Sequence, residues 1–315
     1  MHEYFFANYR LLTDDGIANH ESTKRLAGFA APMPYTHTFT LCLGDVSELE
    51  ERRAWALGCP TAFETEFFTI HDTGEGWAFV NTLADERRLA EGARNVLLCS
   101  RDYSDMTVYV TDRTFNVEWG GHQVRLHASI PMSGSIRTAC EAGMVTRGGL
   151  PLHASLVEKN GFGVAFLGPS GTGKSTQARL WERYLGADFL IGDRPVLRKL
   201  GGHWYGFGMP WDGKDAIYRQ CAVLVRALVW LEQAKENRIL PMKPVQAMSV
   251  MLKQAMMPVW DDAAMDGAAV LMGAVARELP MYHLRCLPDK AAARLTYETI
   301  CKSLPLEGKV ARSAG

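Results

Sequence analysis

Strand-like patterns of apolar and polar residues dominate the first 130 residues of the chain. Several segments alternate apolar with polar side chains or carry short apolar runs, as strands do. Gly120 and Gly121 separate two of these segments and predict a hairpin. One charged segment, 84–95, predicts a short helix. The predicted strands are 4–12, 36–43, 63–69, 106–111, 115–119 and 123–130.

A change of pattern near residue 145 indicates a domain boundary. Apolar residues spaced four apart predict a helix over 133–144, and a glycine pair at 148–149 then breaks the pattern. We therefore expect a smaller β-rich N-terminal domain of unknown role over 1–145. A second domain is expected over 146–315.

The second half of the chain interleaves strands with helices, which predicts an α/β (α+β mixed) fold. The Asn160-Gly161 turn joins the first two strands as an antiparallel hairpin, so the sheet should be mixed. Segment 222–231 fits a strand or a helix equally well. The other predicted strands are 150–157, 164–167, 188–191, 196–200, 203–207 and 281–286, and the predicted helices are 177–184, 245–257 and 289–300.

Composition narrows the class of protein. The chain has 315 residues, of which 47% are hydrophobic and 22% charged, as expected for a globular protein. A net charge of −1 gives no reason to expect a nucleic-acid or membrane partner. The seven cysteines form no C-x-x-C pair, which argues against zinc or a disulfide framework. No signal peptide or long apolar run is visible, so we expect a cytoplasmic protein.

A glycine-rich loop follows the apolar run 164–167 and carries the strongest functional signal. Its sequence Gly-Pro-Ser-Gly-Thr-Gly-Lys-Ser matches the phosphate-binding pattern G-x-x-x-x-G-K-[ST], between a predicted strand and a predicted helix. Such glycines let backbone N–H groups turn inward onto an anion, and Lys174 can follow the β- and γ-phosphates. The Ser175 hydroxyl is placed to ligate Mg²⁺. The predicted nucleotide-binding residues are Gly168, Ser170, Gly171, Thr172, Gly173, Lys174, Ser175 and Thr176.

Phosphoryl transfer also needs a carboxylate near the metal and a group that acts on the acceptor. Asp193 is the leading metal candidate because it follows a predicted strand, although an Asp before Pro195 also caps turns. His153 should lie at the same end of the hairpin as the loop, so a catalytic role is weighed against that of a core histidine. Arg194 could stabilise phosphate charge or merely cover the surface.

Other polar residues are harder to interpret. Trp211, Asp212 and Lys214 lie in a predicted loop, where site residues concentrate, but nothing in the sequence assigns them roles. His122 and His127 lie on or beside the predicted hairpin, and unlinked histidines are more often surface or core residues than metal ligands.

Together these motifs resemble one family. His153-Ala-Ser, the 168–176 loop and Gly192-Asp-Arg194 resemble the catalytic domain of HPr kinase/phosphorylase and the wider group with the phosphoenolpyruvate carboxykinase-type P-loop fold. The resemblance covers about residues 145 to 300. The segment 208–214 is also similar to that of bacterial HPr-kinase-related proteins.

The resemblance implies a kinase that uses ATP and Mg²⁺ to phosphorylate a serine-like hydroxyl of a protein, peptide or small molecule. Asp193 and His153 would be catalytic, and Ser175 and Asp193 would hold the metal. Such kinases usually have two adjacent aspartates here, and Gly192 stands where the first is expected. The alternative is therefore an ATP-binding regulatory module that is catalytically weak or inactive. A carboxykinase reaction is a third, analogy-based reading. The acceptor and the oligomeric state, a homo-oligomer included, stay open.

Overall fold

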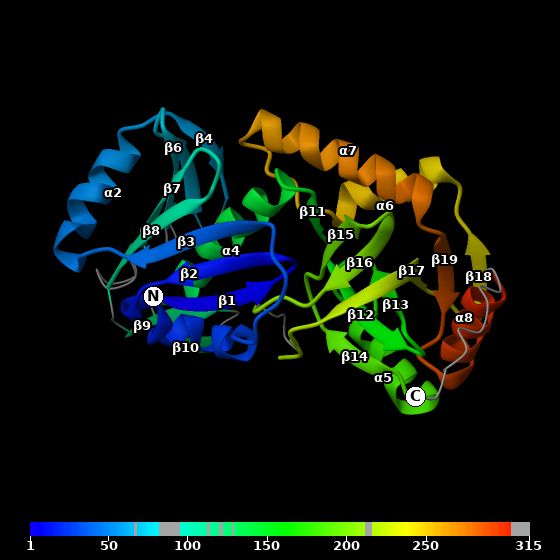
Figure 1. The fold of residues 1–315 in the computed structure, drawn as a ribbon. Helices are drawn as coiled ribbons and strands as arrows, with labels where there is room; N and C mark the ends of the chain where they lie inside the picture. Colours follow the sequence, from blue (N-terminus) through cyan, green and yellow to red (C-terminus); the bar gives the residue numbers. More distant parts are fainter. Residues whose placement is uncertain are drawn as a thin grey trace, which may run out of the picture.

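The fold is a mixed α/β arrangement of two large sheets with helices packed around them (Figure 1). It is a computed structural model that describes residues 1–65, 68–81, 95–111, 114–119, 122–127, 129–211 and 216–303. One sheet belongs to residues 1–145, called here the N-terminal half. The other belongs to residues 146–315, the C-terminal half.

The N-terminal sheet has the strand order β1-β2-β3-β8-β7-β6-β5-β4. Strand β3 pairs in parallel with both β2 and β8, and the other strand pairs of this sheet are antiparallel. A separate antiparallel hairpin pairs β9 with β10. The strands are β1 His2–Phe6, β2 Tyr9–Thr13, β3 His37–Leu43, β4 Thr61–Glu64, β5 Phe68–Asp72, β6 Gly76–Asn81, β7 Asn95–Ser100, β8 Asp105–Val110, β9 Thr114–Trp119 and β10 His122–His127.

Helix α4 (Ser129–Val145) links this sheet to the rest of the molecule. It packs against β6, β7 and β8 on one side and against β11 and α7 of the C-terminal half on the other. Among the described residues of the N-terminal half, the helices are α1 Asp15–Ala18, the 3₁₀ helices η1 Glu21–Phe29 and η2 Val46–Glu48, α2 Leu49–Leu57 and α4.

In the C-terminal sheet the strand order is β11-β15-β16-β17-β13-β12-β14, and β19 with β18 extends from β17. Strands β13, β17 and β19 run parallel, and the other pairs are antiparallel, so the sheet is mixed as predicted. The strands are β11 Gly149–Pro151, β12 Ala154–Lys159, β13 Phe162–Leu167, β14 Asp188–Ile191, β15 Val196–Leu200, β16 His203–Phe207, β17 Ala222–Gln233, β18 Arg238–Pro241 and β19 Met281–Cys286.

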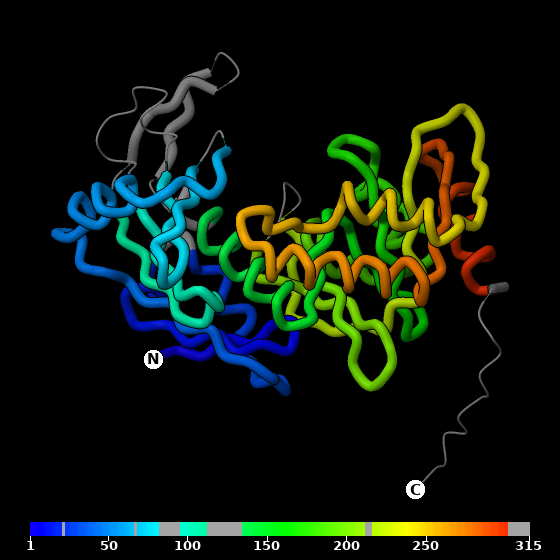
Figure 2. Tube along the Cα trace, turned by 90° about the horizontal axis from the view of Figure 1, so that it is seen from above, coloured from blue at the N-terminus to red at the C-terminus, as the bar shows by residue number. Residues whose placement is uncertain are grey.

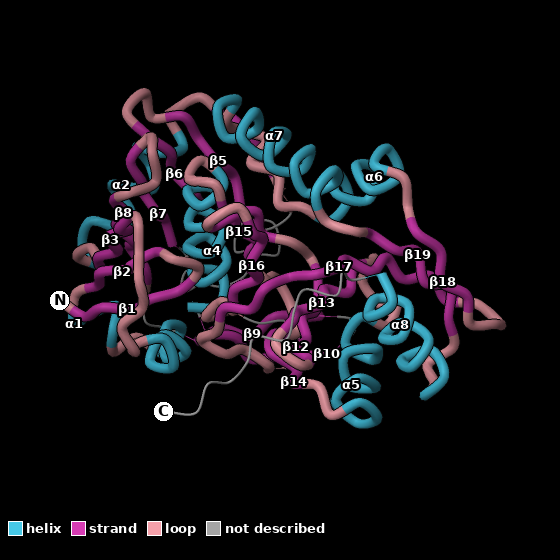
Figure 3. The backbone as a smooth tube through the Cα atoms, turned by 45° about the vertical axis from the view of Figure 1, so that its right-hand side comes forward, coloured by secondary structure: helices cyan, strands magenta, loops and turns pink. Residues whose placement is uncertain are grey.

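Two pairs of helices flank this sheet. Helices α5 (Lys174–Leu185) and α8 (Lys290–Ser303) lie side by side (Figure 3). The buried side chains of α5, Trp181 among them, pack on Phe166 and the neighbouring strands. Helices α6 (Pro244–Gln254) and α7 (Asp262–Glu278) pack together and run along the C-terminal half, as the view from above shows (Figure 2).

The two halves of the chain share one hydrophobic core. It contains buried side chains of the N-terminal sheet, α4, the C-terminal sheet and α7. Polar contacts cross too: Tyr103 donates to Asp261 (2.8 Å), and Arg198 donates to the carbonyl of Ala7 (3.0 Å) and lies 4.4 Å from the ring of Tyr9. The predicted boundary at 145 falls between the two sheets, and the division into 1–145 and 146–315 as domains stays a prediction.

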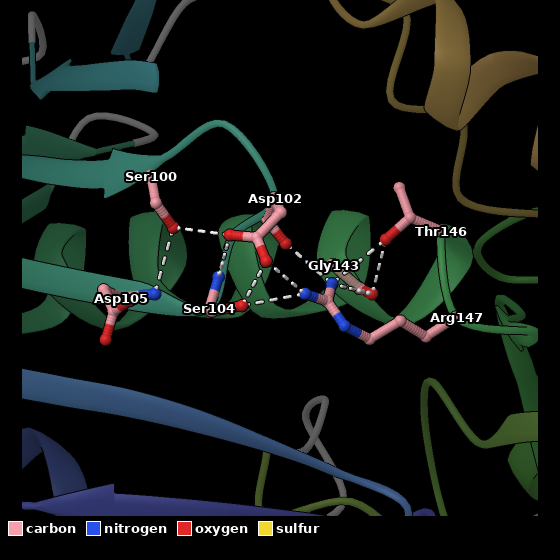
Figure 4. Close-up of polar contacts among 7 residues, drawn as sticks. All are labelled: Ser100, Asp102, Ser104, Asp105, Gly143, Thr146 and Arg147. Carbon is pink, nitrogen blue, oxygen red and sulfur yellow. Dashed lines mark hydrogen bonds and ion pairs between the residues drawn. The ribbon is translucent and has the colours of Figure 1, made fainter. Parts of the chain in front are cut away.

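A polar cluster fixes the C-terminal end of α4 to the β7–β8 turn (Figure 4). The guanidinium of Arg147 donates to the carboxylate of Asp102 (2.9 Å), the Ser104 hydroxyl (2.9 Å) and the Gly143 carbonyl (3.0 Å). A cation that bonds the last carbonyls of a helix stabilises that end.

Most of the predicted elements are present, but three predicted strands are each split in two. Segment 4–12 forms β1 and β2, because Ala7 and Asn8 turn the chain with positive φ angles of 50° and 65°. Segment 63–69 spans the end of β4 and the start of β5, and 150–157 breaks between β11 and β12. The ambiguous segment 222–231 is a strand, β17. The predicted helix over 84–95 lies outside the described residues apart from Asn95, which begins β7.

Candidate functional site

The glycine-rich loop leaves the C-terminal end of β13, which lies between β12 and β17 in the sheet. Strand β13 is buried throughout, and α5 begins at Lys174, so the predicted strand–loop–helix arrangement is confirmed. Gly173 caps α5 with φ +104°, a conformation that glycine adopts without strain. The first N–H groups of α5 have no partner within the helix and give this end of it a partial positive charge.

Contacts from within and beyond the loop brace it. The Thr172 hydroxyl donates to the Pro169 carbonyl (2.8 Å), and a Cβ on Gly168 would collide with that hydroxyl. The Gly168 N–H donates to the side-chain oxygen of Gln254 at the end of α6 (3.3 Å). Gln254 comes from 86 residues further along the chain, and no sequence signal pointed to it.

Lys174 is buried at the base of the loop. Its ammonium donates to the carbonyls of Gly168 (2.8 Å) and Pro169 (3.3 Å) and lies 3.0 Å from Nε2 of His153. Burial lowers the pKa of Lys174, and the carboxylate of Asp193 acts in the opposite direction. The ammonium therefore lies among two loop carbonyls and an imidazole nitrogen, next to the positive end of α5.

His153 lies at the bend between β11 and β12, and not inside one long strand as predicted. Its backbone N–H donates to the carbonyl of Gln254 (2.7 Å), which fixes the bend. Burial lowers the pKa of His153, the charges of Lys174 and Arg194 lower it further, and Asp193 raises it. Because the Lys174 ammonium can only donate, Nε2 of His153 is the acceptor, and the imidazole that accepts is neutral.

Asp193, just after the end of β14, also lies near His153. Its Oδ1 lies 4.0 Å from Nε2 of His153, and this oxygen is buried without a hydrogen-bond partner among the described residues. The preceding peptide is fixed on both sides, since the Gly192 N–H donates to Ile217 (2.9 Å) and its carbonyl accepts from Ser155 (2.9 Å). The structure thus brings Lys174, His153 and Asp193 together from three separate elements.

Arg194 has an unexpected partner. Its backbone has φ +58°, which is rare for a side chain other than glycine, and its guanidinium donates to Glu141 of α4 (2.8 Å). The Glu141 side chain is 1% exposed. Arg137, one turn earlier on α4, faces the same cluster, and burial lowers its pKa while Glu141 raises it. The Arg194 side chain therefore joins the site to the N-terminal half.

The remaining predicted site residues are less tightly placed. Ser175 is half-buried on the first turn of α5, and Thr176 beside it is exposed. Among the described residues no group of three or more His, Cys, Asp or Glu side chains is arranged to hold a metal ion. Trp211 packs against Phe6 of β1 (ring centroids 5.6 Å apart), and Asp212 and Lys214 lie outside the described residues. His122 and His127 lie at the two ends of β10.

Two hollows flank the loop. One, of about 370 Å³, lies between the first turn of α5 and the ends of β17 and β19, with Gln177, Gln233 and Cys286 in its wall. The other, of about 440 Å³, borders Ser170 and Trp230. Both volumes lie within the range of small-molecule sites.

Comparisons with known proteins add little. No family model and no curated protein matches the chain. Among solved structures, the chain is similar to the Hpr(Ser) kinase/phosphatase from Coxiella burnetii, at 14% sequence identity and a TM-score of 0.28, over 48% of this chain and 88% of that one. A TM-score this low carries no argument about fold or function. None of the helices in the described ranges is both long and apolar enough to cross a bilayer.

Proposed function

We propose that the protein is a kinase that uses ATP and Mg²⁺ to transfer the γ-phosphoryl group to a hydroxyl of a protein, peptide or small molecule. The observation that carries this proposal is the meeting of Lys174, His153 and Asp193 at the glycine-rich loop. A nucleotide-binding loop alone does not specify a reaction. A neutral imidazole and a carboxylate next to such a loop support phosphoryl transfer.

The triphosphate would bind along the loop and the N-terminal end of α5. Backbone N–H groups there are oriented by the glycines, and the helix end favours negative charge. The Lys174 ammonium, now on the carbonyls of Gly168 and Pro169, would exchange them for phosphate oxygens. A charge-assisted hydrogen bond to phosphate is stronger than one to a carbonyl, which favours the exchange.

The Mg²⁺ ion fits the residues present. Asp193 has a buried carboxylate oxygen without a hydrogen-bond partner among the described residues, and Ser175 offers a hydroxyl on the first turn of α5. Mg²⁺ usually takes one or two protein ligands and completes its shell with phosphates and water. When bound, the ion would neutralise phosphate charge. Asp193 and Ser175 would hold it.

His153 would act on the acceptor. Its imidazole is neutral, and once Lys174 turns to the phosphates its Nε2 is free to accept the proton of the attacking hydroxyl. This role compensates for Gly192, which supplies no side chain at the position where the resembling kinases have their first aspartate. Arg194 is held by Glu141 and contributes positive charge behind Asp193.

The test is transfer of label from γ-labelled ATP with Mg²⁺ to a pool of cytosolic metabolites and peptides. The wild-type chain should yield a phosphorylated acceptor, and Lys174→Ala should abolish the product. Asp193→Asn should show little transfer activity at any Mg²⁺ concentration. Absence of transfer to every acceptor, with the wild-type chain folded and binding ATP, would reject the kinase reading.

One observation favours a second function, an ATP-binding module that regulates a partner without catalysis. Gly192 has no side chain, and its N–H and carbonyl are both hydrogen-bonded, so this residue offers the acceptor no carboxylate. This alternative predicts tight ATP binding by calorimetry and no turnover with any acceptor. The kinase reading predicts both binding and turnover.

A further inference from the structure

Gln254, the last residue of α6, lies where the antiparallel pairing of β12 with β13 stops. The last residue pair of these two strands is Ala154 with Leu167. The next residue on one strand is His153, at the bend after β11, and the next on the other is Gly168, which begins the glycine-rich loop. Because the pairing ends there, the N–H groups of both residues need partners from another element.

Gln254 supplies both partners. Its main-chain carbonyl, at the end of α6, has no partner within the helix and accepts from the His153 N–H (2.7 Å). Its side-chain Oε1 accepts from the Gly168 N–H (3.3 Å). Its side-chain nitrogen donates to the Lys253 carbonyl (2.9 Å), which sets the orientation of the amide, and the residue is 5% exposed. One buried residue of α6 therefore bridges the two strand ends.

The chain after Gln254 is tied to the same bend. Leu152 and Ala255 form an isolated β-bridge, and the Met256 N–H donates to the Pro151 carbonyl (3.0 Å). The bend is thus bonded to the end of α6 at several successive residues. A side chain on a backbone held in this way can keep its partner in a fixed position.

Gln254 also closes a ring of four hydrogen bonds. Its Oε1 accepts from the Gly168 N–H, and the Gly168 carbonyl accepts from the Lys174 ammonium (2.8 Å). That ammonium donates to Nε2 of His153 (3.0 Å), and the His153 N–H donates back to Gln254. The proposed turn of Lys174 toward phosphate oxygens would open its two bonds. The two bonds made by Gln254 would remain.

We propose that Gln254 is a positioning residue of the transfer reaction, which keeps the phosphate-binding loop at a fixed distance from the imidazole of His153. The inference rests on the proposed kinase function. In this role Gln254 touches neither ATP nor the acceptor, and it acts through the Gly168 N–H and the backbone of His153. A displacement of about 1 Å between reacting groups can lower a rate by about 10²-fold, so this contact should affect the rate more than it affects binding.

The experiment measures two quantities for each variant. One is the rate of label transfer from saturating γ-labelled ATP with Mg²⁺ to the pool of cytosolic metabolites and peptides, and the other is the affinity for ATP by calorimetry. Gln254→Met keeps the length of the side chain and removes the acceptor of the Gly168 N–H. Its transfer rate should fall by about 10- to 100-fold, while its dissociation constant for ATP stays within about threefold of the wild-type value. A merely structural role would reduce the number of ATP-binding molecules and leave the rate per binding site unchanged.

Gln254→Glu is the rescue variant, because its carboxylate again accepts from the Gly168 N–H. Its transfer rate from saturating ATP should return to within about threefold of the wild-type rate, while its negative charge beside the loop weakens ATP binding. Gln246→Met is the matched control. It makes the same change near the start of α6, where Gln246 accepts from the Lys243 N–H (2.8 Å), and both quantities should keep their wild-type values.

A wild-type transfer rate in Gln254→Met, or a Gln254→Glu variant as slow as Gln254→Met, overturns the positioning role and leaves the kinase proposal standing. If the wild-type chain binds ATP but transfers no label to any acceptor, the kinase proposal itself falls, and the positioning role falls with it.

Discussion

A single hydrogen bond joins Lys174 to His153, and it would couple the phosphate-binding and proton-accepting roles proposed for these two residues. The ammonium and Nε2 lie 3.0 Å apart, and burial lowers the pKa of both groups. The two side chains can share this hydrogen bond because the neutral imidazole accepts it and the ammonium donates it. A phosphate that draws Lys174 away would release the imidazole for the acceptor, so binding of ATP would activate the base.

Replacement of Lys174 by methionine should weaken ATP binding by about 10- to 100-fold, because a charge-assisted hydrogen bond contributes about 1.5–3 kcal/mol. Calorimetric titration with ATP and Mg²⁺ measures this. Lys159→Met, at the far end of the β12–β13 hairpin, removes a similar charge from outside the site and should bind ATP normally. Normal binding by Lys174→Met would remove the lysine from the phosphate site.

His153 leads to a pH prediction. In the proposed reaction the imidazole accepts the proton of the attacking hydroxyl, and its pKa is lowered from the usual value of about 6.5. The transfer rate of the wild-type chain should therefore persist below that pH and fall only as the pH drops through the lowered pKa. His153→Gln should lower the rate by about 10²- to 10⁴-fold and abolish this acid limb. An unchanged limb in the variant would mean that another group titrates.

At the scale of elements, the turn after β14 depends on α4. Arg194 holds a strained backbone conformation, and the buried carboxylate of Glu141 holds its guanidinium. A buried charge that loses its partner is costly. The turn that places Asp193 is thus fixed by a helix of the N-terminal half.

Arg194→Ala should destabilise the protein by about 1–3 kcal/mol, since it removes the hydrogen-bond donor from a buried carboxylate oxygen of Glu141 while the charge of Arg137 stays nearby. Adding Glu141→Gln to this variant should recover part of the loss, because the side chain that lost its donor is then neutral. Urea unfolding of both single variants and the double variant measures the coupling. Arg219→Ala breaks a pair with Asp188 whose two side chains are 53% and 62% exposed, and should cost less than about 1 kcal/mol. Simple additivity of Arg194→Ala and Glu141→Gln would contradict the pairing.

Local signals predicted local structure well. The Asn160-Gly161 turn correctly gave the β12–β13 hairpin, and the loop motif gave the strand before it and the helix after it. The turn at Ala7 and Asn8 was missed because neither residue is a glycine or a proline, although both adopt positive φ. Helix α7 also went unpredicted; it is apolar on more than one face, which blurs its period.

In the candidate site, too, the sequence predicted the residues near the loop but not those from distant helices. His153, Lys174 and Asp193 could be predicted because each lies close to the loop along the chain or across one hairpin. Gln254 and Glu141 could not, because they reach the site from helices distant in the sequence, and a single glutamine or glutamate has no local pattern. Such partners follow from packing and not from spacing.

At the scale of the whole molecule, one hydrophobic core joins the two halves, and the polar cluster around Arg147 lies at the junction. Partial burial opposes ionisation of Asp102, but hydrogen bonds from Ser104 and Ser100 and the charge of Arg147 outweigh it and lower its pKa to about 2. The unfolded value is about 3.9. The ionised carboxylate therefore stabilises the folded protein above that pH.

This shift predicts a loss of stability in acid. The contribution of Asp102 should be complete above about pH 4 and decline as the pH falls toward 2, because the folded state binds its proton last. The free energy of unfolding, measured in urea across this range, should fall less steeply in Asp102→Asn. Asp105 contributes its backbone N–H and not its carboxylate to this cluster, so Asp105→Asn is the matched control. Equal slopes for Asp102→Asn and the wild type would contradict the pKa assignment.

The most direct measurement is a crystal structure of the chain with Mg²⁺ and a non-hydrolysable ATP analogue. The account predicts that the γ-phosphate lies on Lys174, that Ser175 and Asp193 hold the metal, and that His153 faces the space beyond the γ-phosphate. An analogue bound elsewhere, with Lys174 still on the Gly168 carbonyl, would contradict it.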